Sequence, residues 1–250
     1  SSGFEIGYQN GEQFISLFKD KSLKKLVVRK DSFFAQTGNI MSEYSPDSSA
    51  VPEGKKFGPY HIQIDGNYEN YDLVMEQVNT LRQRGIDAFP AFVEGKFKIW
   101  TGLFTSQQQA REAWNQVMEK TGVNSCTLIM PSPQRIQLLL PEQEVPIMIF
   151  ENSTFALSAQ PISDKEQTAL VSINGKLYRG RVIFKRFTDS DMTVINRLSL
   201  EEYLYGVLPY EMAGSWPLEA LKAQAVAART YAVLHLNKYS KWQFNLCSTT

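Results

Sequence analysis

The 250-residue chain has few cysteines and no long apolar run. Its two cysteines, Cys126 and Cys247, are too few for a disulfide scaffold, and they fit a reducing and an oxidising compartment equally well. No apolar stretch approaches the roughly 20 residues of a membrane-spanning helix, and the start lacks the pattern of a signal peptide. Because the chain also begins without an initiator methionine, we expect a fragment or mature form of a longer protein.

The chain also lacks a surplus of charge of either sign. Lys plus Arg and Asp plus Glu both number 26, so no global field would draw the protein onto a nucleic acid or an anionic membrane. The composition, 43% apolar and 21% charged, is that of a folded protein. We therefore expect a neutral or mixed-charge partner and no nucleic acid.

The order of apolar patterns predicts an α+β protein in four segments. Residues 1–40 read as short strands, and residues 41–57, which have no periodicity, read as a linker. Residues 58–130 follow a β-α-β-β-α-β order, and residues 131–250 mix strands and helices. Because the strands between Phe4 and Val28 are too short for a core of their own, we expect them to pair with strands around 147–195.

The 58–130 segment has the clearest periodicity. Its helices are predicted at 71–84, ended by Gly85, and at 106–120, capped by Ser106. Its strands are predicted at 60–65, 88–93, 97–104 and 127–130. In the 131–250 segment, strands are predicted at 136–140, 147–150, 169–173, 177–187 and 192–195, with Asn174-Gly175 as a hairpin turn and a long helix at 215–236.

The passage from Val194 to Ala232 has the arrangement of a site. A short helix at 198–205, capped at Ser199, is predicted to end at Gly206-Val207-Leu208-Pro209 and to lead into Glu211. A carboxylate held between Tyr210, Met212 and Trp216 would be partly desolvated, which would raise its pKa and suit it to donate a proton. The alternative is an acidic residue that only stabilises a nearby helix start.

The long helix adds polar residues to this passage. Lys222 and Arg229 are seven residues apart and share a helix face, with Gln224 in the same two turns. A solvated basic stripe is the alternative interpretation of the same spacing.

Residues 194–212 and 215–232, together with 173–180, resemble the signature of the SpoIID/LytB family. The resemblance implies a lytic transglycosylase that cuts the glycan strands of peptidoglycan, as in spore engulfment. It implies Glu211 as the catalytic acid and Lys222 and Arg229 as groove residues, to which we add Tyr210 and Gln224 as candidates for substrate binding. A single carboxyl group suffices for this lyase chemistry, whereas a hydrolase needs a second carboxylate, for which Glu201, Glu202 and Glu219 remain candidates.

In the resembled family the domain continues beyond the stretch that ends at Thr250, so we expect this domain to be truncated at its C-terminus. Some members bind zinc there through Cys and His residues. His235 and Cys247 are the local candidates, but two ligands do not make a site, so we expect no metal and no other cofactor from this chain.

The 58–130 segment resembles a SPOR domain, which binds glycan strands stripped of stem peptides on the open face of its sheet. Strand alternation predicts that Gln63, Lys98, Trp100 and His61 face outward on that side, where an indole and polar groups would bind a sugar. The alternative is that Trp100 packs under the linker. An RNA-binding module with the same β-α-β-β-α-β order is not favoured, because the chain has no surplus of basic residues.

Together these features predict a bacterial peptidoglycan-binding and peptidoglycan-cleaving protein of the cell wall or envelope, outside the cytoplasm. Other cell-wall hydrolases are candidate partners. The competing hypothesis is a non-catalytic wall-binding or scaffold protein.

Overall fold

The computed structural model describes residues 3–123, 125–163, 169–187 and 191–247. The fold is α+β, as predicted. The chain divides into two compact units: unit 1 comprises Ser1–Lys24, Ser158–Lys185 and Thr193–Thr250, and unit 2 comprises Lys25–Leu157 and Arg186–Met192. Each unit is described by itself. In the described part of the chain, no helix is both long and apolar enough to span a membrane.

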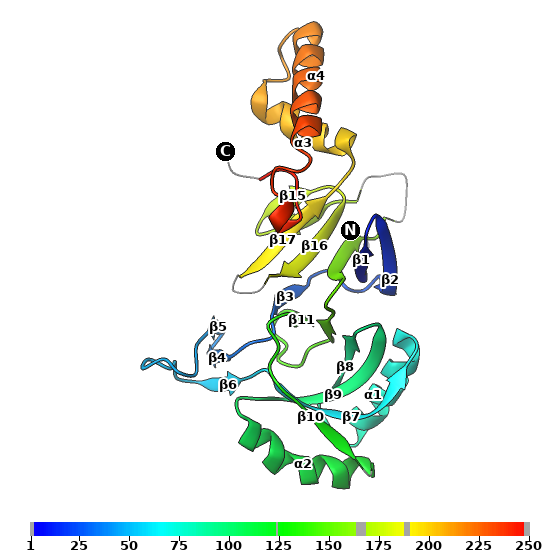
Figure 1. The fold of residues 1–250 in the computed structure, drawn as a ribbon, viewed down its shortest axis with the longest axis vertical. Coiled ribbons are helices and arrows are strands. Elements are labelled where there is room, and N and C mark those ends of the chain that lie inside the picture. Colours follow the sequence, from blue (N-terminus) through cyan, green and yellow to red (C-terminus); the bar gives the residue numbers. More distant parts are fainter. Residues whose placement is uncertain (1–2, 124, 164–168, 188–190, 248–250) are drawn as a thin grey trace. The chain divides into compact units, whose positions relative to one another are not determined.

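In unit 2, seven described strands form the large sheet, in the order β10-β7-β9-β8-β12-β11-β3 (Figure 1). These strands are β3 (Val27–Lys30), β7 (Tyr60–Tyr68), β8 (Ala88–Val93), β9 (Lys96–Phe104), β10 (Cys126–Ile129), β11 (Ile136–Leu139) and β12 (Met148–Glu151). Strands β10, β7, β9 and β8 pair antiparallel, and β12 pairs parallel with β8. The predicted β-α-β-β-α-β order is therefore confirmed, and β12, β11 and β3 extend its sheet beyond residues 58–130.

Two helices pack against the large sheet. Helix α1 (Tyr71–Gln83) contacts β7, β8 and β9, and α2 (Gln107–Thr121) contacts β7, β9 and β10. The side chains of Asn70 and Ser106 accept a backbone N–H at the start of each helix, and left-handed glycines, Gly85 and Gly122, follow their ends. Local sequence thus determines both helix boundaries.

Residues 34–57 contain a small sheet, in the order β5-β4-β6. Its strands are β4 (Phe34–Thr37), β5 (Ile40–Glu43) and β6 (Lys55–Phe57). The linker predicted at 41–57 therefore includes strand residues at both ends. Phe34 and Phe57 are opposite one another in the register and both are buried, which explains why this segment is ordered despite its polar turn.

In unit 1, five described strands form the unit 1 sheet, in the order β17-β16-β13-β1-β2. They are β1 (Phe4–Asn10), β2 (Gln13–Asp20), β13 (Ala156–Pro161), β16 (Arg181–Arg186) and β17 (Met192–Arg197). The N-terminal strand β1 lies beside β13, which is the expected pairing with the 147–195 region. Strand β13 itself was not predicted, because Ser158 and Pro161 give it a weak strand pattern.

A separate hairpin joins β14 (Val171–Ile173) and β15 (Lys176–Tyr178). Its turn residues, Asn174 and Gly175, have φ angles of 49° and 82°, so the predicted hairpin turn is confirmed.

Two helices complete unit 1: α3 (Leu200–Glu211) and α4 (Leu218–Leu234). Ser199 and Glu202 form a capping box at the start of α3, as the sequence indicates. The predicted end at 206–209 is wrong. Pro209 lies in the last turn of the helix, where it removes only one backbone bond, and Met212 N–H still donates to the Leu208 carbonyl. A 3-10 turn, η1 (Ser240–Trp242), follows α4.

Candidate functional site

Glu211 is the last residue of α3, and its side chain is exposed. The adjacent Tyr210 is 93% exposed and Trp216 is 55% exposed. The prediction that these neighbours bury the carboxylate is therefore wrong, because Tyr210 extends into solvent and does not cover Glu211. The site presents an accessible carboxylate flanked by accessible aromatic rings.

Tyr203 lies on α3, two turns before Glu211, and was not predicted as part of the site. Burial raises the pKa of the Tyr203 phenol, and the nearby Tyr231 of α4 and the negative charge of Glu211 raise it further. The eight-residue spacing from Tyr203 to Glu211 places both near one helix face, which was the available sequence signal. Tyr203 is thus a neutral hydroxyl group close to the carboxylate.

Arg229 on α4 forms a bidentate ion pair with Glu201 on α3. Its Nη2 donates to Glu201 Oε1 at 2.8 Å and to Oε2 at 3.0 Å, and its Nε donates to Oε1 at 3.2 Å. The predicted groove arginine therefore connects the two helices. Because α3 carries Glu211 at its other end, this pair orients the helix on which the carboxylate lies.

The other predicted polar residues lie on α4. Lys222 Nζ donates to Glu219 Oε1 at 2.8 Å, which leaves most of the ammonium in solvent, and Gln224 is half-buried. Among the described residues, no hydrogen bond or ion pair joins Glu211 to Lys222, Gln224 or Arg229. Tyr210 and Glu211 thus lie together at the end of α3, whereas Lys222, Gln224 and Arg229 lie along α4.

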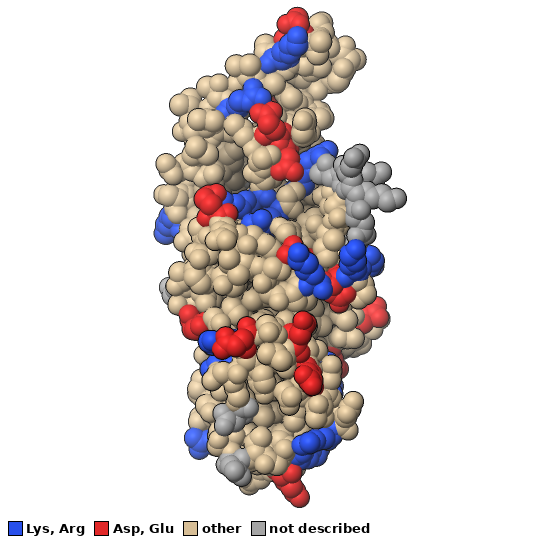
Figure 2. Space-filling view, turned by 90° about the vertical axis from the view of Figure 1, so that its right-hand side faces the viewer, with Lys and Arg blue, Asp and Glu red and all other residues tan. Residues whose placement is uncertain are grey.

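Apolar side chains on α3 and α4 are exposed to an unusual extent. The exposed large apolar residues of this region are Tyr205, Tyr210, Trp216, Leu218, Val226, Tyr231, Val233 and Leu234. Figure 2 shows acidic and basic groups interspersed over the visible face, in keeping with the equal numbers of each charge.

The predicted glycan-binding face of the large sheet is covered. Trp100 is 1% exposed and His61 is fully buried, so the prediction that they face solvent is wrong. The guanidinium of Arg135 lies 4.8 Å from the Trp100 ring, and Val145 packs on the same core cluster. Trp100 thus packs under the 131–146 segment, whereas the alternative interpretation placed it under the 41–57 linker.

The remaining two residues predicted on this face, Gln63 and Lys98, are half-buried. Trp100 Nε1 donates to Gln63 Oε1 at 3.2 Å, so the amide oxygen satisfies the buried indole N–H. The Gln63 side chain therefore makes a contact inside the protein, whereas strand alternation predicts that it faces solvent.

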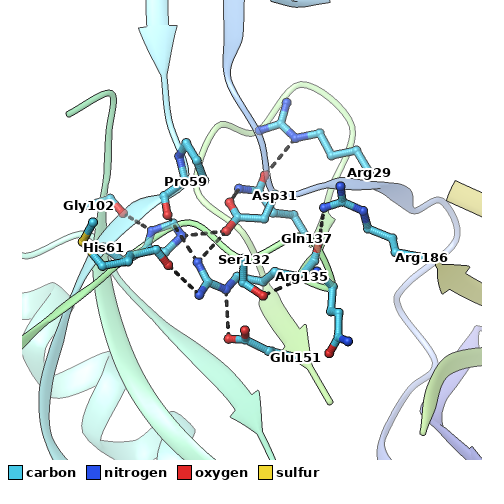
Figure 3. A network of polar contacts seen from close by, with 12 residues as sticks. Arg29, Asp31, Pro59, His61, Gly102, Ser132, Arg135, Gln137, Glu151 and Arg186 are labelled. Atoms are coloured by element: carbon cyan, nitrogen blue, oxygen red, sulfur yellow. Dashed lines mark hydrogen bonds and ion pairs between the residues drawn. The ribbon is translucent and has the colours of Figure 1, made fainter. Parts of the chain in front are cut away.

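A buried polar network lies beside Trp100 (Figure 3). Arg135 Nη1 donates to Asp31 Oδ2 at 3.0 Å, and Arg135 Nε donates to Glu151 Oε2 at 3.0 Å. Gln137 Nε2 donates to the other oxygen of Asp31 at 2.6 Å, and His61 Nε2 lies 3.0 Å from Oδ2. These contacts satisfy both oxygens of a fully buried carboxylate.

The charges in this network compensate one another. Burial raises the pKa of Asp31, but the charges and hydrogen bonds of His61 and Arg135 outweigh it and hold that pKa below its usual value. His61 Nδ1 lies 2.7 Å from the Gly102 carbonyl oxygen, which can only accept. Both ring nitrogens of His61 thus have a partner within the network. The network connects β3, β7, β11 and β12 and stabilises the large sheet.

No group of three or more His, Cys, Asp or Glu side chains in the described residues could hold a metal ion. Cys247 is exposed, and His235 Nδ1 lies 2.7 Å from the Tyr231 carbonyl oxygen. These two donors do not make up a zinc ligand set among the described residues.

One comparison places a known family on the C-terminal part of the chain. The sequence model of the stage II sporulation protein family, SpoIID, matches residues 188–250. An uncharacterised protein of Brachyspira hyodysenteriae is 50% identical over 80 residues, which make up 32% of this chain and 22% of that protein. No solved structure matches the chain.

Two Bacillus subtilis proteins are also similar. The amidase enhancer is 48% identical over 64 residues, 25% of this chain and 9% of that protein. Stage II sporulation protein D is 32% identical over 109 residues, 43% of this chain and 29% of that protein. The chain thus matches less than a third of the length of each of these relatives, and the similarity supports a SpoIID-like segment that contains α3 and α4.

Proposed function

We propose that the protein acts on the bacterial cell wall as a lytic transglycosylase, with Glu211 as its acid and base. The observation that carries the proposal is the position of Glu211: an accessible carboxylate at the end of α3, inside the SpoIID-like segment and flanked by exposed aromatic rings. Neutral sugar rings bind well to flat apolar surfaces with polar groups at their rim.

In the proposed reaction, Glu211 donates its proton to the glycosidic oxygen as the bond to the sugar breaks. The same carboxylate then accepts the proton of the C6 hydroxyl as that oxygen closes on the anomeric carbon, which forms a 1,6-anhydro sugar. No water is consumed, and Glu211 returns to its protonated state. A second carboxylate at a defined separation, which a hydrolase needs, has no part in this scheme.

An exposed carboxylate is a weak acid catalyst at neutral pH because water stabilises its ionised form. A glycan strand bound over Tyr210 and Trp216 would displace this water and favour the protonated form. The negative charge of Glu211 already affects the neighbouring phenol of Tyr203. Tyr203 is therefore within electrostatic reach of the carboxylate.

The substrate is proposed to lie along α3 and α4. Lys222 and Gln224 are available to bind polar groups of the strand, while Arg229 is held by Glu201 and orients the helices. The partner is thus peptidoglycan, and the place of action is the wall or envelope, outside the cytoplasm. We extend the same proposal to a role in sporulation and to cooperation with other wall hydrolases.

The test is mass spectrometry of the products that the complete protein releases from purified sacculi. Anhydro-muropeptides that disappear with Glu211→Gln, and persist with the matched control Glu219→Gln, would establish the proposed chemistry. Sacculi that bind both proteins and are cut by neither would leave the non-catalytic wall-binding protein as the function.

A further inference from the structure

Aromatic and basic side chains gather at the C-terminal end of α4. The rings of Tyr231 and His235, one helical turn apart, have their centroids 4.0 Å from one another and an interplanar angle of 30°. His235 Nδ1 also lies 2.7 Å from the Tyr231 carbonyl oxygen, which fixes the imidazole beside the phenol. The Tyr231 ring is therefore held on one face, although the residue is 47% exposed.

Lys238 joins this cluster from the turn that follows α4. The charges of the Tyr231 and Tyr239 phenols raise the pKa of Lys238, and the two phenols also accept hydrogen bonds from its ammonium. Lys238 Nζ lies 5.4 Å from the centre of the Tyr239 ring, and the residue is exposed. An ammonium has three N–H donors, so two phenols do not use all of them.

Tyr239 is held by the segment that follows it. Its ring stacks on the ring of Phe244, with centroids 5.0 Å apart and an interplanar angle of 29°, and the two residues also form an antiparallel bridge. The Trp242 N–H donates to the Tyr239 carbonyl oxygen at 2.9 Å. Residues 239–244 thus form a short turn that keeps the Tyr239 phenol beside Lys238.

This cluster lies on the same two helices as Glu211, but toward their other end. Burial raises the pKa of Tyr203 on α3, and the nearby Tyr231 raises it further, so the two phenols are neighbours across the helix pair. Arg229, two residues before Tyr231, pairs with Glu201 near the start of α3. The eight residues from Tyr203 to Glu211 span about 12 Å of helix. A sugar over Tyr231 would therefore be a different unit of a strand from the one that Glu211 protonates.

We propose that Tyr231, Lys238 and Tyr239 form a second sugar-binding subsite for the glycan strand. The inference rests on the proposed function for the choice of polymer. An exposed aromatic ring with hydrogen-bond donors at its rim suits a sugar ring, which has an apolar face and oxygens at its edge. Because the neighbouring rings already hold these groups in place, little conformational freedom is lost on binding.

The position of the subsite predicts how it acts. A short oligosaccharide bound at Glu211 does not reach Tyr231, whereas a longer strand contacts both places. The subsite touches a part of the strand that does not react, so its contacts are equally strong before and during bond breakage. Loss of the subsite should therefore raise KM for long strands and leave kcat unchanged.

The test measures binding without cleavage. The complete protein with Glu211→Gln is titrated calorimetrically with two denuded peptidoglycan oligosaccharides, a disaccharide and a chain of four disaccharides. In this background, Tyr231→Ala removes the ring and Lys238→Met removes the ammonium at an exposed position. Lys176→Met, at an exposed lysine of β15 in the same unit, is the matched control. Circular dichroism checks that each variant is folded.

We expect Tyr231→Ala and Lys238→Met to bind the long oligosaccharide roughly tenfold more weakly, and the disaccharide and the control to be unaffected. Equal weakening at both lengths, unchanged binding of the long oligosaccharide, or no binding of either probe would overturn the proposal. Failure of the proposed function would look different. Sacculi would remain uncut by the protein with Glu211 intact, while the length-dependent binding persisted.

Discussion

Arg229 on α4 binds both carboxylate oxygens of Glu201 on α3, with Nη2 at 2.8 and 3.0 Å from them. The pair connects the two helices that carry the SpoIID-like residues. A helix face shows which residues are neighbours along one helix, whereas the partner of Arg229 comes from another helix.

Glu201→Gln should lower the free energy of unfolding by about 0.5 kcal/mol, because both side chains are partly exposed and water screens the pair. The measurement is denaturant unfolding of the purified protein. Glu219→Gln, which removes the more exposed i,i+3 partner of Lys222, is the matched control and should change stability less. A loss of several kcal/mol in Glu201→Gln would show that the pair is more deeply buried than the structure indicates.

Trp100→Ala should destabilise unit 2 by about 3–5 kcal/mol, because it removes a fully buried indole together with its contacts to His61 and Arg135. Trp216→Ala, at an exposed tryptophan, should cost less than about 0.5 kcal/mol. Urea unfolding followed by circular dichroism separates the two. If both substitutions were equally mild, Trp100 would have to be accessible in solution, as the predicted glycan-binding face requires.

The buried Asp31 should make the protein sensitive to acid. Its native pKa is lowered below the unfolded value, so the ionised form is favoured by folding. The resulting stabilisation is complete above the unfolded pKa, near 4, and is lost as the pH falls through the lower native value.

Free energies of unfolding measured from pH 2 to pH 7 test this prediction. Asp31→Asn should be destabilised by about 3–5 kcal/mol at neutral pH, because it leaves His61 and Arg135 without their buried carboxylate, and it should lose less stability in acid than the wild type. Asp47→Asn, at an exposed site, serves as the control. An unchanged acid dependence in Asp31→Asn would contradict the role given to this carboxylate.

Gly102→Ala should be more harmful than Gly11→Ala, although both glycines have left-handed backbone conformations. Their φ angles are 79° and 56°, so each substitution carries a backbone cost of about 1 kcal/mol. At Gly102 an added Cβ would also lie 2.0 Å from the Phe104 ring, whereas nothing lies within 4 Å at Gly11. Thermal unfolding should show a clearly larger decrease in Tm for Gly102→Ala; equal decreases would mean that Phe104 moves aside freely.

In unit 2, the local sequence was sufficient to predict the helices and the order of the helices and strands. Asn70 and Ser106 cap α1 and α2, Gly122 ends α2, and the Asn174-Gly175 turn lies where its dipeptide predicts. These features depend on backbone conformations that a few adjacent residues favour strongly.

Tertiary structure decided the properties that depend on distant residues. Alternation along β9 correctly places Trp100 on the face opposite Ile99, but only the packing of Arg135 and Val145 decides that this face is covered. The joining of β12, β11 and β3 to the large sheet likewise requires contacts between segments more than 50 residues apart. Periodicity therefore determined which side of a strand each residue occupies. The exposure of a side chain, its ion-pair partners and the extent of the sheet depended on the segments that pack against that side, because burial is a property of the whole folded chain.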